Sequence, residues 1–303
     1  MSRSRHSSAG IIGHLGRVAR SLPESRTKSR AGRVLSSALA KIGCNPVQIG
    51  MLADGTRLWL DARERTEAAP FWNGHYEDND IAMLEASLRP GGDYVDVGAH
   101  VGLLAAPLAR RQLTNGGRVL AIEPSAANVE RLRRSLALDP RLVEITTVVQ
   151  CALGASKGVV ELLGERPSKT GNAAIVPQGL AAGVGEPVPM RTMDAVLDEL
   201  GHRRVDAIKL DVEGYEFEVL RGARQCLERD RPVVYGEFAP DFMARYGGSL
   251  SDVVDLVRPL GYRYFTQTLD ARFVEHEVPG ADLAYVILVP EDRAGDWRRR
   301  VSR

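Results

Sequence analysis

The chain has 303 residues, of which 44% are hydrophobic and 26% are charged, so it is long enough for one large α/β core or two small domains. Its net charge of +1 hides an asymmetry: residues 1–41 hold nine Lys or Arg and one Glu, which leaves 31 basic and 38 acidic residues in the rest. A body that binds nucleic acid would need a basic stripe, so this balance argues against nucleic acid as a partner.

The cysteines and the apolar runs exclude further classes of protein. Cys44, Cys151 and Cys226 are scattered and form no CxxC pair, so we expect neither a disulfide framework nor a thiolate zinc site, and we expect a reducing, cytoplasmic location. Glycine and histidine interrupt the apolar residues within 11–17, so these do not form a signal peptide. No run approaches the roughly eighteen apolar residues of a transmembrane segment.

Residues 1–45 are expected to form a basic extension that is partly disordered and partly helical. Apolar residues recur at helical spacing in 11–22 and again in 34–42, and Gly43 ends the second pattern. A basic amphipathic helix of this kind could contact a membrane or an acidic partner. A solvated tail or a small packing helix also fits the pattern, and we favour that second interpretation.

Residues 46–92 are expected to contain a β-hairpin and a lead-in helix. Alternating apolar residues in 47–62 flank Asp54 and Gly55, a pair typical of a hairpin turn.

From residue 93 onward, apolar runs typical of strands alternate with helical patterns, which predicts a doubly wound, mostly parallel sheet with helices on both faces. We assign this α/β domain to 93–292, followed by a basic tail at 293–303. A Gly- and Pro-rich insertion at 155–190 interrupts the alternation and is a candidate rim or lid. The expected strands are 94–97, 118–123, 145–152, 205–211, 233–238, 262–266 and 283–289, and the expected helices are 101–112, 126–138, 193–200, 216–229 and 250–257.

The first strand of this domain ends in a carboxylate, Asp96, and a small-residue turn that opens a helix. Gly98 and Gly102 remove side chains where the backbone must approach a ligand or a neighbouring element. Neither GxGxxG nor GxxxxGK[ST] occurs, so a dinucleotide or a nucleoside triphosphate is not favoured. Asp96 instead suits a ligand with cationic or hydroxyl groups, and S-adenosylmethionine carries both an ammonium and a sulfonium.

Two further strand ends carry polar or accessible groups. Glu123 and Pro124 follow the second strand about twenty residues after the turn, where a doubly wound fold places an acid on a ribose, although an acid here can also simply start a helix. The third strand ends at residues 151–154, whose backbone could meet an adenine edge or could be an ordinary strand exit.

The segment 208–216 brings two more acids to the carboxyl end of a strand. Asp211 and Glu213 could accept a proton, hold a divalent metal, or cap the following helix. Lys209 could pair with one of these acids, and for it we favour a structural role.

Taken together, these motifs resemble an FkbM-type S-adenosylmethionine-dependent methyltransferase over roughly residues 70–290. The matching segments are 74–77, 96–102, 123–124, 152–154, 192–194 and, above all, 208–223.

The resemblance implies a class I methyltransferase fold with a seven-stranded sheet. It also implies O-methylation of a hydroxyl on a small molecule or glycan of the polyketide, sugar or glycolipid type. Asp96 to Gly102 would line the methionine end of the cofactor, Glu123 its ribose and Ala152 its adenine, with Asp211 near the methyl group. His100 departs from the asparagine usual in the family and adds a group that can titrate near neutral pH. The implied cofactor-binding residues are Glu77, Asp96, Gly98, Ala99, His100, Gly102, Glu123, Pro124, Ala152 and Asp211.

Methyl transfer to a hydroxyl also needs a group that removes the hydroxyl proton. The candidates are Asp211 first, Glu213 second and His100 third. A Mg²⁺ ion held by Asp211 and Glu237 would do similar work by acidifying the hydroxyl. Two alternatives remain open: a catalytically silent binding protein with this fold, and an NAD(P)-dependent oxidoreductase, for which both GxGxxG and a Tyr-x-x-x-Lys pair are missing.

Overall fold

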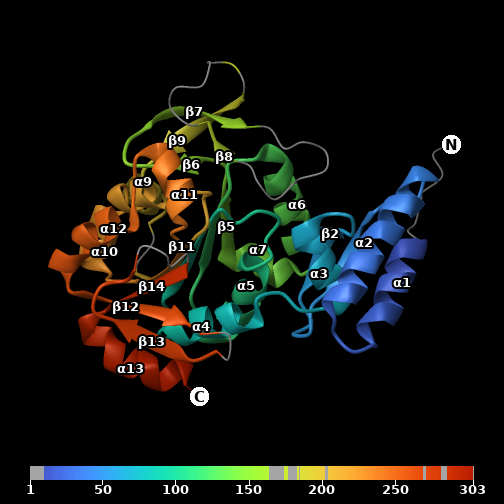
Figure 1. The fold of residues 1–303 in the computed structure, drawn as a ribbon, viewed down its shortest axis with the longest axis horizontal. Helices are drawn as coiled ribbons and strands as arrows, with labels where there is room; N and C mark the ends of the chain where they lie inside the picture. The colour runs from blue at the N-terminus through green and yellow to red at the C-terminus, as the bar shows by residue number, and fades with distance from the viewer. Residues whose placement is uncertain are drawn as a thin grey trace.

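A computed structural model describes residues 10–163, 174–176, 183, 185–201, 204–268, 271–280 and 285–302. The body of the molecule is built on a twisted sheet with helices on both faces, and an arm formed by the first two helices projects from one side (Figure 1).

The main sheet has eight strands in the order β13-β12-β14-β11-β10-β3-β4-β5 within the described residues. The strands β5, β4, β3, β10 and β11 pair in parallel, β14 is antiparallel to both of its neighbours, and β13 is antiparallel to β12. The strands are β3 (Asp93–Val97), β4 (Val119–Ile122), β5 (Thr146–Val149), β10 (Val205–Leu210), β11 (Val233–Glu237), β12 (Tyr262–Gln267), β13 (Phe273–His276) and β14 (Tyr285–Pro290).

This arrangement confirms the doubly wound, mostly parallel α/β fold and corrects the strand count from seven to eight. The additional strand, β13, pairs only with β12 at the sheet edge and has no buried residue, so it lacks the apolar signal of the others. The seventh expected strand is β14, although its expected first residues, 283 and 284, lie outside the described residues.

Two hydrophobic clusters cover the two faces of the sheet. One face packs against α4 (Asp78–Ser87), α5 (Ala105–Asn115), α6 (Ala126–Leu136), α7 (Pro140–Ile145) and α13 (Glu291–Val301). The other packs against α8 (Met193–Leu200), α9 (Glu216–Arg221), α10 (Arg224–Arg229) and α12 (Leu250–Val257).

The helix expected at 216–229 is two helices, because the chain breaks at Gly222. A Cβ on Gly222 would lie 2.1 Å from the carbonyl oxygen of Gly154, so glycine lets the chain pass this strand exit closely. The Asp194 carboxylate accepts hydrogen bonds from the backbone N–H groups of Gln225 and Cys226, which stabilises the start of α10.

The insertion forms a second sheet in the order β6-β9-β7-β8. The strand expected at 145–152 is therefore split, with β5 in the main sheet and β6 in this one. The expected segment 155–190 is described only in part, because residues 164–173, 177–182 and 184 lie outside the described residues. The strands are β6 (Ala152–Leu153), β7 (Gly158–Leu163), β8 (Ala174–Ile175) and β9 (Glu186–Arg191).

The N-terminal part contains α1 (Ile11–Arg20), α2 (Arg26–Lys41), the hairpin β1 (Val47–Met51) and β2 (Arg57–Asp61), and α3 (Arg65–Asn73). The hairpin confirms the expected turn at residues 54 and 55, whereas the single lead-in helix is two, α3 and α4. A buried ion pair between Glu67 on α3 and Arg131 on α6 fastens this part to the body. Within the described ranges, no helix is long and apolar enough to cross a membrane.

The expected C-terminal tail is a packed helix, α13. The Trp297 side chain is buried against the rings of Phe265 and Phe273, and its Nε1 donates a 2.9 Å hydrogen bond to Ser87 Oγ. The three consecutive arginines at 298–300 made this segment resemble an exposed tail in the sequence, although one side of the helix is buried.

Candidate active site

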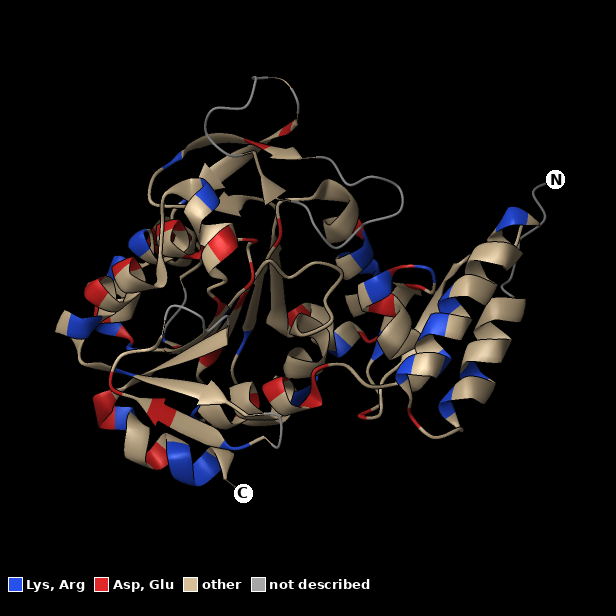
Figure 2. Cartoon of the chain, viewed as in Figure 1, with Lys and Arg blue, Asp and Glu red and all other residues tan. Residues whose placement is uncertain are grey.

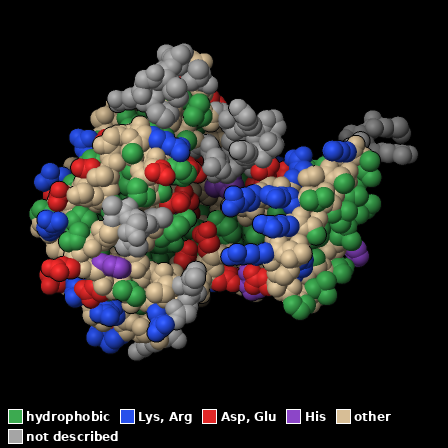
Figure 3. Space-filling view, in the orientation of Figure 1, with side chains coloured by type: hydrophobic (Ala, Val, Ile, Leu, Met, Phe, Trp, Pro, Cys, Tyr) green, Lys and Arg blue, Asp and Glu red, His purple; other side chains and the backbone are tan. Residues whose placement is uncertain are grey.

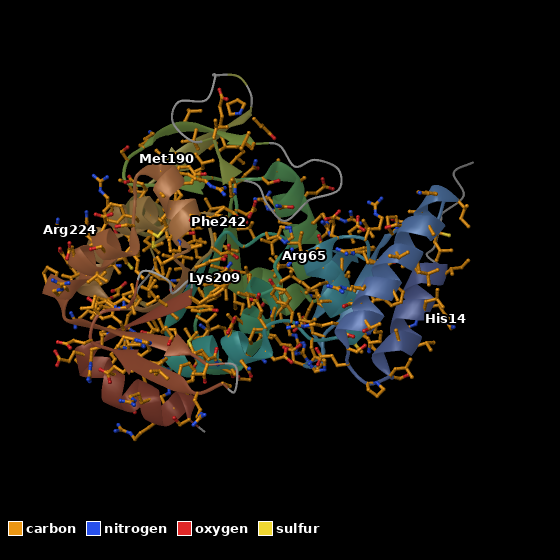
Figure 4. All side chains as sticks on the ribbon, viewed as in Figure 1. His14, Arg65, Met190, Lys209, Arg224 and Phe242 are labelled. Atoms are coloured by element: carbon orange, nitrogen blue, oxygen red, sulfur yellow. The ribbon has the colours of Figure 1, made fainter. Side chains whose placement is uncertain are left out.

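A cavity of about 730 Å³ opens at the carboxyl ends of β3, β4, β10 and β11, within the range typical of small-molecule sites. Lys209 lies near the centre of the molecule, with Phe242 of α11 (Pro240–Met243) above it and Arg65 of α3 on the side of the arm (Figure 4). All three side chains line the cavity. Figure 3 shows acidic side chains on one side of the hollow and basic ones on the side of the arm. Of the expected site residues, the cavity lining includes Glu77, Asp96, Gly98, Ala99, His100, Glu123, Pro124, Ala152, Asp211, Glu213 and Glu237.

The turn after β3 is tied to both neighbouring strands. The N–H groups of Gly98 and Ala99 donate to the carbonyl oxygen of Ile122, over 2.9 and 3.0 Å. Gly98 has a φ of +78°, and a Cβ on it would lie 1.9 Å from the carbonyl oxygen of Asp211. Only glycine fits here, because any side chain would push the β3 turn away from the end of β10.

Gly102, also expected to bind the cofactor, is not among the residues that line the cavity. Its φ is +90°, and a Cβ there would lie 2.4 Å from Leu132 Cδ1 on α6. Gly102 therefore allows close packing of the turn against α6.

We expect Gly98→Ala to abolish cofactor binding, because the new Cβ meets rigid backbone rather than a flexible side chain. Gly116→Ala is the matched control, since Gly116 has a similar φ of +80° but nothing within 4 Å of the added Cβ. The control should lose only about 1 kcal/mol of stability, because alanine is less favourable than glycine in a left-handed backbone conformation. Calorimetry and thermal melts of both variants check this, and equal losses of binding would contradict the assigned role of Gly98.

Asp96 is a buried carboxylate whose two oxygens have no hydrogen bond of normal geometry, although the Ala105 N–H and the Tyr94 hydroxyl lie near enough to lower its pKa. The nearest cation is Lys209, whose Nζ lies 3.8 Å from Asp96 Oδ1. Burial raises the pKa of Asp96 to about 6, and Lys209 opposes that rise. A buried acid with unsatisfied oxygens that lines a cavity fits a ligand with a positive charge.

Lys209 bridges the ends of β3 and β10. Its Nζ lies 3.1 Å from Asp211 Oδ2 and 3.4 Å from the carbonyl oxygen of Gly98. Burial lowers the pKa of Lys209, but the carboxylates of Asp211, Asp96 and Glu77 raise it above its ordinary value. This ammonium therefore stays charged and holds two acids and the glycine turn together, which confirms that Lys209 pairs with one of the acids after its strand.

Glu123 holds the glycine turn and the start of α6 at once. Its Oε2 accepts a 2.9 Å hydrogen bond from the N–H of His100, and its Oε1 accepts from the N–H of Ser125 at 3.0 Å and from Asn128 Nδ2 at 3.3 Å. The sequence allowed two roles for Glu123, a ribose-binding acid or an acid that starts a helix. In the structure, Glu123 stabilises the start of α6 and also lines the cavity beside the glycine turn.

Strained backbone is concentrated at this cavity. Glu77, His100 and Glu213 have φ values of 43°, 51° and 57°, and these are three of the five non-glycine residues with positive φ in the described chain. All three line the cavity. Such clustering is typical of functional sites, where the surrounding structure maintains a conformation that the residue would not choose alone.

Glu77 and Glu213 are also perturbed electrostatically. Burial raises the pKa of each to about 7, and repulsion from Asp211 adds to it in both cases. For Glu213, the carboxylate of Glu237 raises the pKa further. These acids exchange protons near neutral pH, which is the property that acid–base chemistry needs.

A model of the FkbM methyltransferase domain matches residues 96–264, more than half of the chain, and this range spans the glycine turn, Glu123 and the Asp211 segment. The chain belongs to the FkbM methyltransferase family. It is 29% identical over 202 residues to the methyltransferase sdnD of Sordaria araneosa, which covers 56% of this chain and 74% of that protein.

Two solved structures resemble this family member. The FkbM methyltransferase of Methylobacillus flagellatus is 21% identical with a TM-score of 0.44, and the match covers 66% of this chain and 44% of that one. An S-adenosylmethionine-dependent O-methyltransferase of Thermotoga maritima is 15% identical with a TM-score of 0.36, over 71% of this chain and 66% of that one. The family match and the strand order, rather than these scores, identify the class I methyltransferase fold.

The expected metal ligands, Asp211 and Glu237, both line the cavity. No group of three or more His, Cys, Asp or Glu side chains within the described ranges is arranged to hold a metal ion. Two carboxylates alone leave most of the coordination shell of Mg²⁺ to other ligands.

Several cavity residues had no signal of their own in the sequence. Leu162 and Ile175 come from the second sheet and place this insertion at the rim, as expected. Arg65 reaches the cavity from α3, and Tyr285 from β14. They lie far from the strand-end motifs in the chain, so only the tertiary fold brings them to the site. Tyr76 could have been found, because it lies within the matching segment 74–77.

Proposed function

We propose that the chain is an S-adenosylmethionine-dependent O-methyltransferase that acts on a hydroxyl group of a small molecule or glycan, of the polyketide, sugar or glycolipid type. The observation that carries the cofactor assignment is the buried carboxylate of Asp96 beside the Gly98 turn, whose oxygens line the cavity without a hydrogen bond of normal geometry. A cationic ligand would satisfy this acid, and the cofactor supplies the methyl group when bound.

We assign the acids that line the cavity to different parts of the cofactor. We assign Asp96, Glu77 and Asp211 to the positively charged methionine end of the cofactor, since their carboxylates surround Lys209 and leave an excess of negative charge. Glu123 is assigned to the ribose and Ala152 to the adenine, with Pro124 and the backbone of 98–100 beside them. Glu123 retains acceptor capacity for ribose hydroxyls, because each carboxylate oxygen has two lone pairs.

Glu213 becomes our first candidate for the base, ahead of Asp211 and His100. The Asp211 carboxylate is committed to an ion pair with Lys209 at 3.1 Å. Glu213 has no such cation within hydrogen-bond reach in the described residues, and its pKa of about 7 suits a base that must be ionised and still accept a proton. In this assignment, Asp211 faces the cofactor and Glu213 removes the hydroxyl proton of the acceptor.

The proposal includes no metal and places the protein in the cytoplasm, where its cysteines would remain thiols. A silent binding protein with this fold is the main alternative, and it would bind the cofactor without turnover.

Calorimetry tests the cofactor assignment. We expect binding of S-adenosylmethionine and S-adenosylhomocysteine, and no binding of NAD. Affinity for either ligand should fall as the pH decreases through about 7 to below 6, because Glu77 and then Asp96 take up protons and lose the negative charge that attracts the ligand ammonium. Tight NAD binding without a response to S-adenosylhomocysteine would refute the proposal. Binding without methyl transfer to any member of a panel of hydroxylated acceptors would favour the silent alternative.

A further inference from the structure

The arm formed by α1 and α2 carries an unusual share of the exposed apolar surface. Of the fourteen large hydrophobic side chains exposed in the described chain, six lie within residues 11–42, on or directly after α1 and α2. Scattered single exposed apolar residues are common, but a cluster on one element indicates a surface that contacts something. The six are Ile11, Val18, Leu22, Val34, Leu35 and Ile42.

The same arm is strongly basic. Residues 10–45 contain seven Lys or Arg and one acidic residue, Glu24. Figure 2 shows basic residues distributed along both helices of the arm. Five of these cations form no ion pair with a described carboxylate, so their charge is available to an external partner: Arg17, Arg26, Arg30, Arg33 and Lys41.

The two kinds of side chain form adjacent stripes on α2. The buried side of this helix is narrow, with Gly32 against the Trp72 ring and Ser36 hydrogen-bonded to the Gly32 carbonyl oxygen. At 100° per residue, the remaining surface presents an apolar stripe beside a basic one. The apolar stripe is Ala31, Val34, Leu35, Ala38 and Ile42, and the basic stripe is Arg26, Arg30, Arg33 and Lys41.

A shallow groove of about 560 Å³ lies where the stripes meet. Val34, Ala38 and Ile42 line its apolar part, and Arg33, Lys41 and Arg63 line its basic part. Figure 3 shows the same separation over the whole arm, with basic side chains toward the body and hydrophobic ones along the outer edge.

We propose that the α1–α2 arm binds the surface of an anionic lipid bilayer. An apolar stripe edged by Lys and Arg is the pattern of helices that lie in the membrane interface, where apolar side chains enter the acyl boundary and cations contact headgroup phosphates. The arm projects from the body, so it can lie on a flat surface without disturbing the cavity (Figure 1). This proposal is independent of the methyl acceptor and takes up the membrane-binding interpretation of the N-terminal pattern.

Charge argues against the other occupants. A second copy of the chain would bring two arms with the same excess of positive charge together, which costs free energy. Nucleic acid would satisfy the cations but leave the apolar stripe in water. An anionic bilayer can bury the apolar stripe in its acyl boundary and bind the basic stripe through its headgroup phosphates.

Co-sedimentation of the full chain with phospholipid vesicles tests the proposal. We expect binding to vesicles that contain phosphatidylglycerol, weaker binding to pure phosphatidylcholine, and release by salt as the Debye length shortens. The triple variant Arg26→Gln, Arg30→Gln, Lys41→Gln should bind on the order of a hundred-fold more weakly, because each cation near an anionic surface contributes about five-fold. The affinity of the double variant Val34→Glu, Ile42→Glu for anionic vesicles should be at least about ten-fold lower than that of the wild type.

Val159→Glu is the matched control, since Val159 on β7 is 71% exposed, as Val34 and Ile42 are at 69% and 76%, but lies outside the arm. It should bind vesicles as the wild type does, and all variants should keep the wild-type melting temperature and affinity for S-adenosylhomocysteine. The proposal is overturned by no binding to anionic vesicles, by equal binding to neutral ones, or by equal losses in Val159→Glu. Light scattering that shows a dimer abolished by Val34→Glu, Ile42→Glu would overturn it in favour of a second copy.

Discussion

Glu213→Gln should reduce kcat by about a hundred- to ten-thousand-fold, the contribution typical of a general base. Glutamine keeps the size and the left-handed backbone position of the side chain but cannot accept the proton of the acceptor hydroxyl. Cofactor affinity should change little, because Asp96, Glu77 and Asp211 carry the charge at the methionine end. Turnover with a saturating acceptor, together with calorimetry of S-adenosylhomocysteine binding, measures the two quantities separately.

Glu237→Gln is the control for Glu213, since Glu237 also lines the cavity and burial also raises its pKa. The reduction in kcat in Glu237→Gln should be much smaller than the reduction in Glu213→Gln. A base must be ionised before it accepts a proton, so wild-type kcat should rise with pH through about 7 and then level off. Glu213→Gln should lose this inflection. A larger loss in Asp211→Asn, with the inflection intact in Glu213→Gln, would move the base to Asp211.

The strands that carry the site could be predicted because they are buried on both faces. β3, β4 and β10 are buried at every position and rich in apolar residues, and the carboxylates near their ends mark the edge where parallel sheets bind ligands. The sequence therefore predicts that Asp96, Glu123 and Asp211 lie around one ligand, and all three line the same cavity.

Features set by contacts between distant segments could not be predicted. The break at Gly222 depends on Gly154, and the packing role of Gly102 depends on Leu132, and neither neighbour is near in the chain. The sequence also leaves open which acid pairs with Lys209, and the observed pairing with Asp211 is what favours Glu213 as the base. The half-exposed edge strand β13 and the buried Trp297 in an arginine-rich segment were missed because their local composition resembles a surface.

Lys209→Met should destabilise the protein by about 3 kcal/mol or more near pH 8, the usual cost of removing one partner from a buried ion pair. Methionine fills a similar volume, so the loss reflects charge rather than packing. The melting temperature should fall by about 5 to 10 °C. Lys157→Met is the control, because Lys157 is exposed on the second-sheet insertion and should shift the melting temperature little.

The dependence on pH separates the charge argument from a general loss of packing. Burial already raises the pKa of Asp96 to about 6, and without Lys209 that pKa must rise further. An acid whose pKa is higher in the folded state stabilises the fold while protonated, and it loses that stabilisation as the pH rises through the folded-state value. The gap between the melting temperatures of wild type and Lys209→Met should therefore be small near pH 5 and widen toward pH 8. A gap of the same size at both pH values would mean that Lys209 supports the fold through its methylene chain, and that Asp96 and Asp211 do not need its charge.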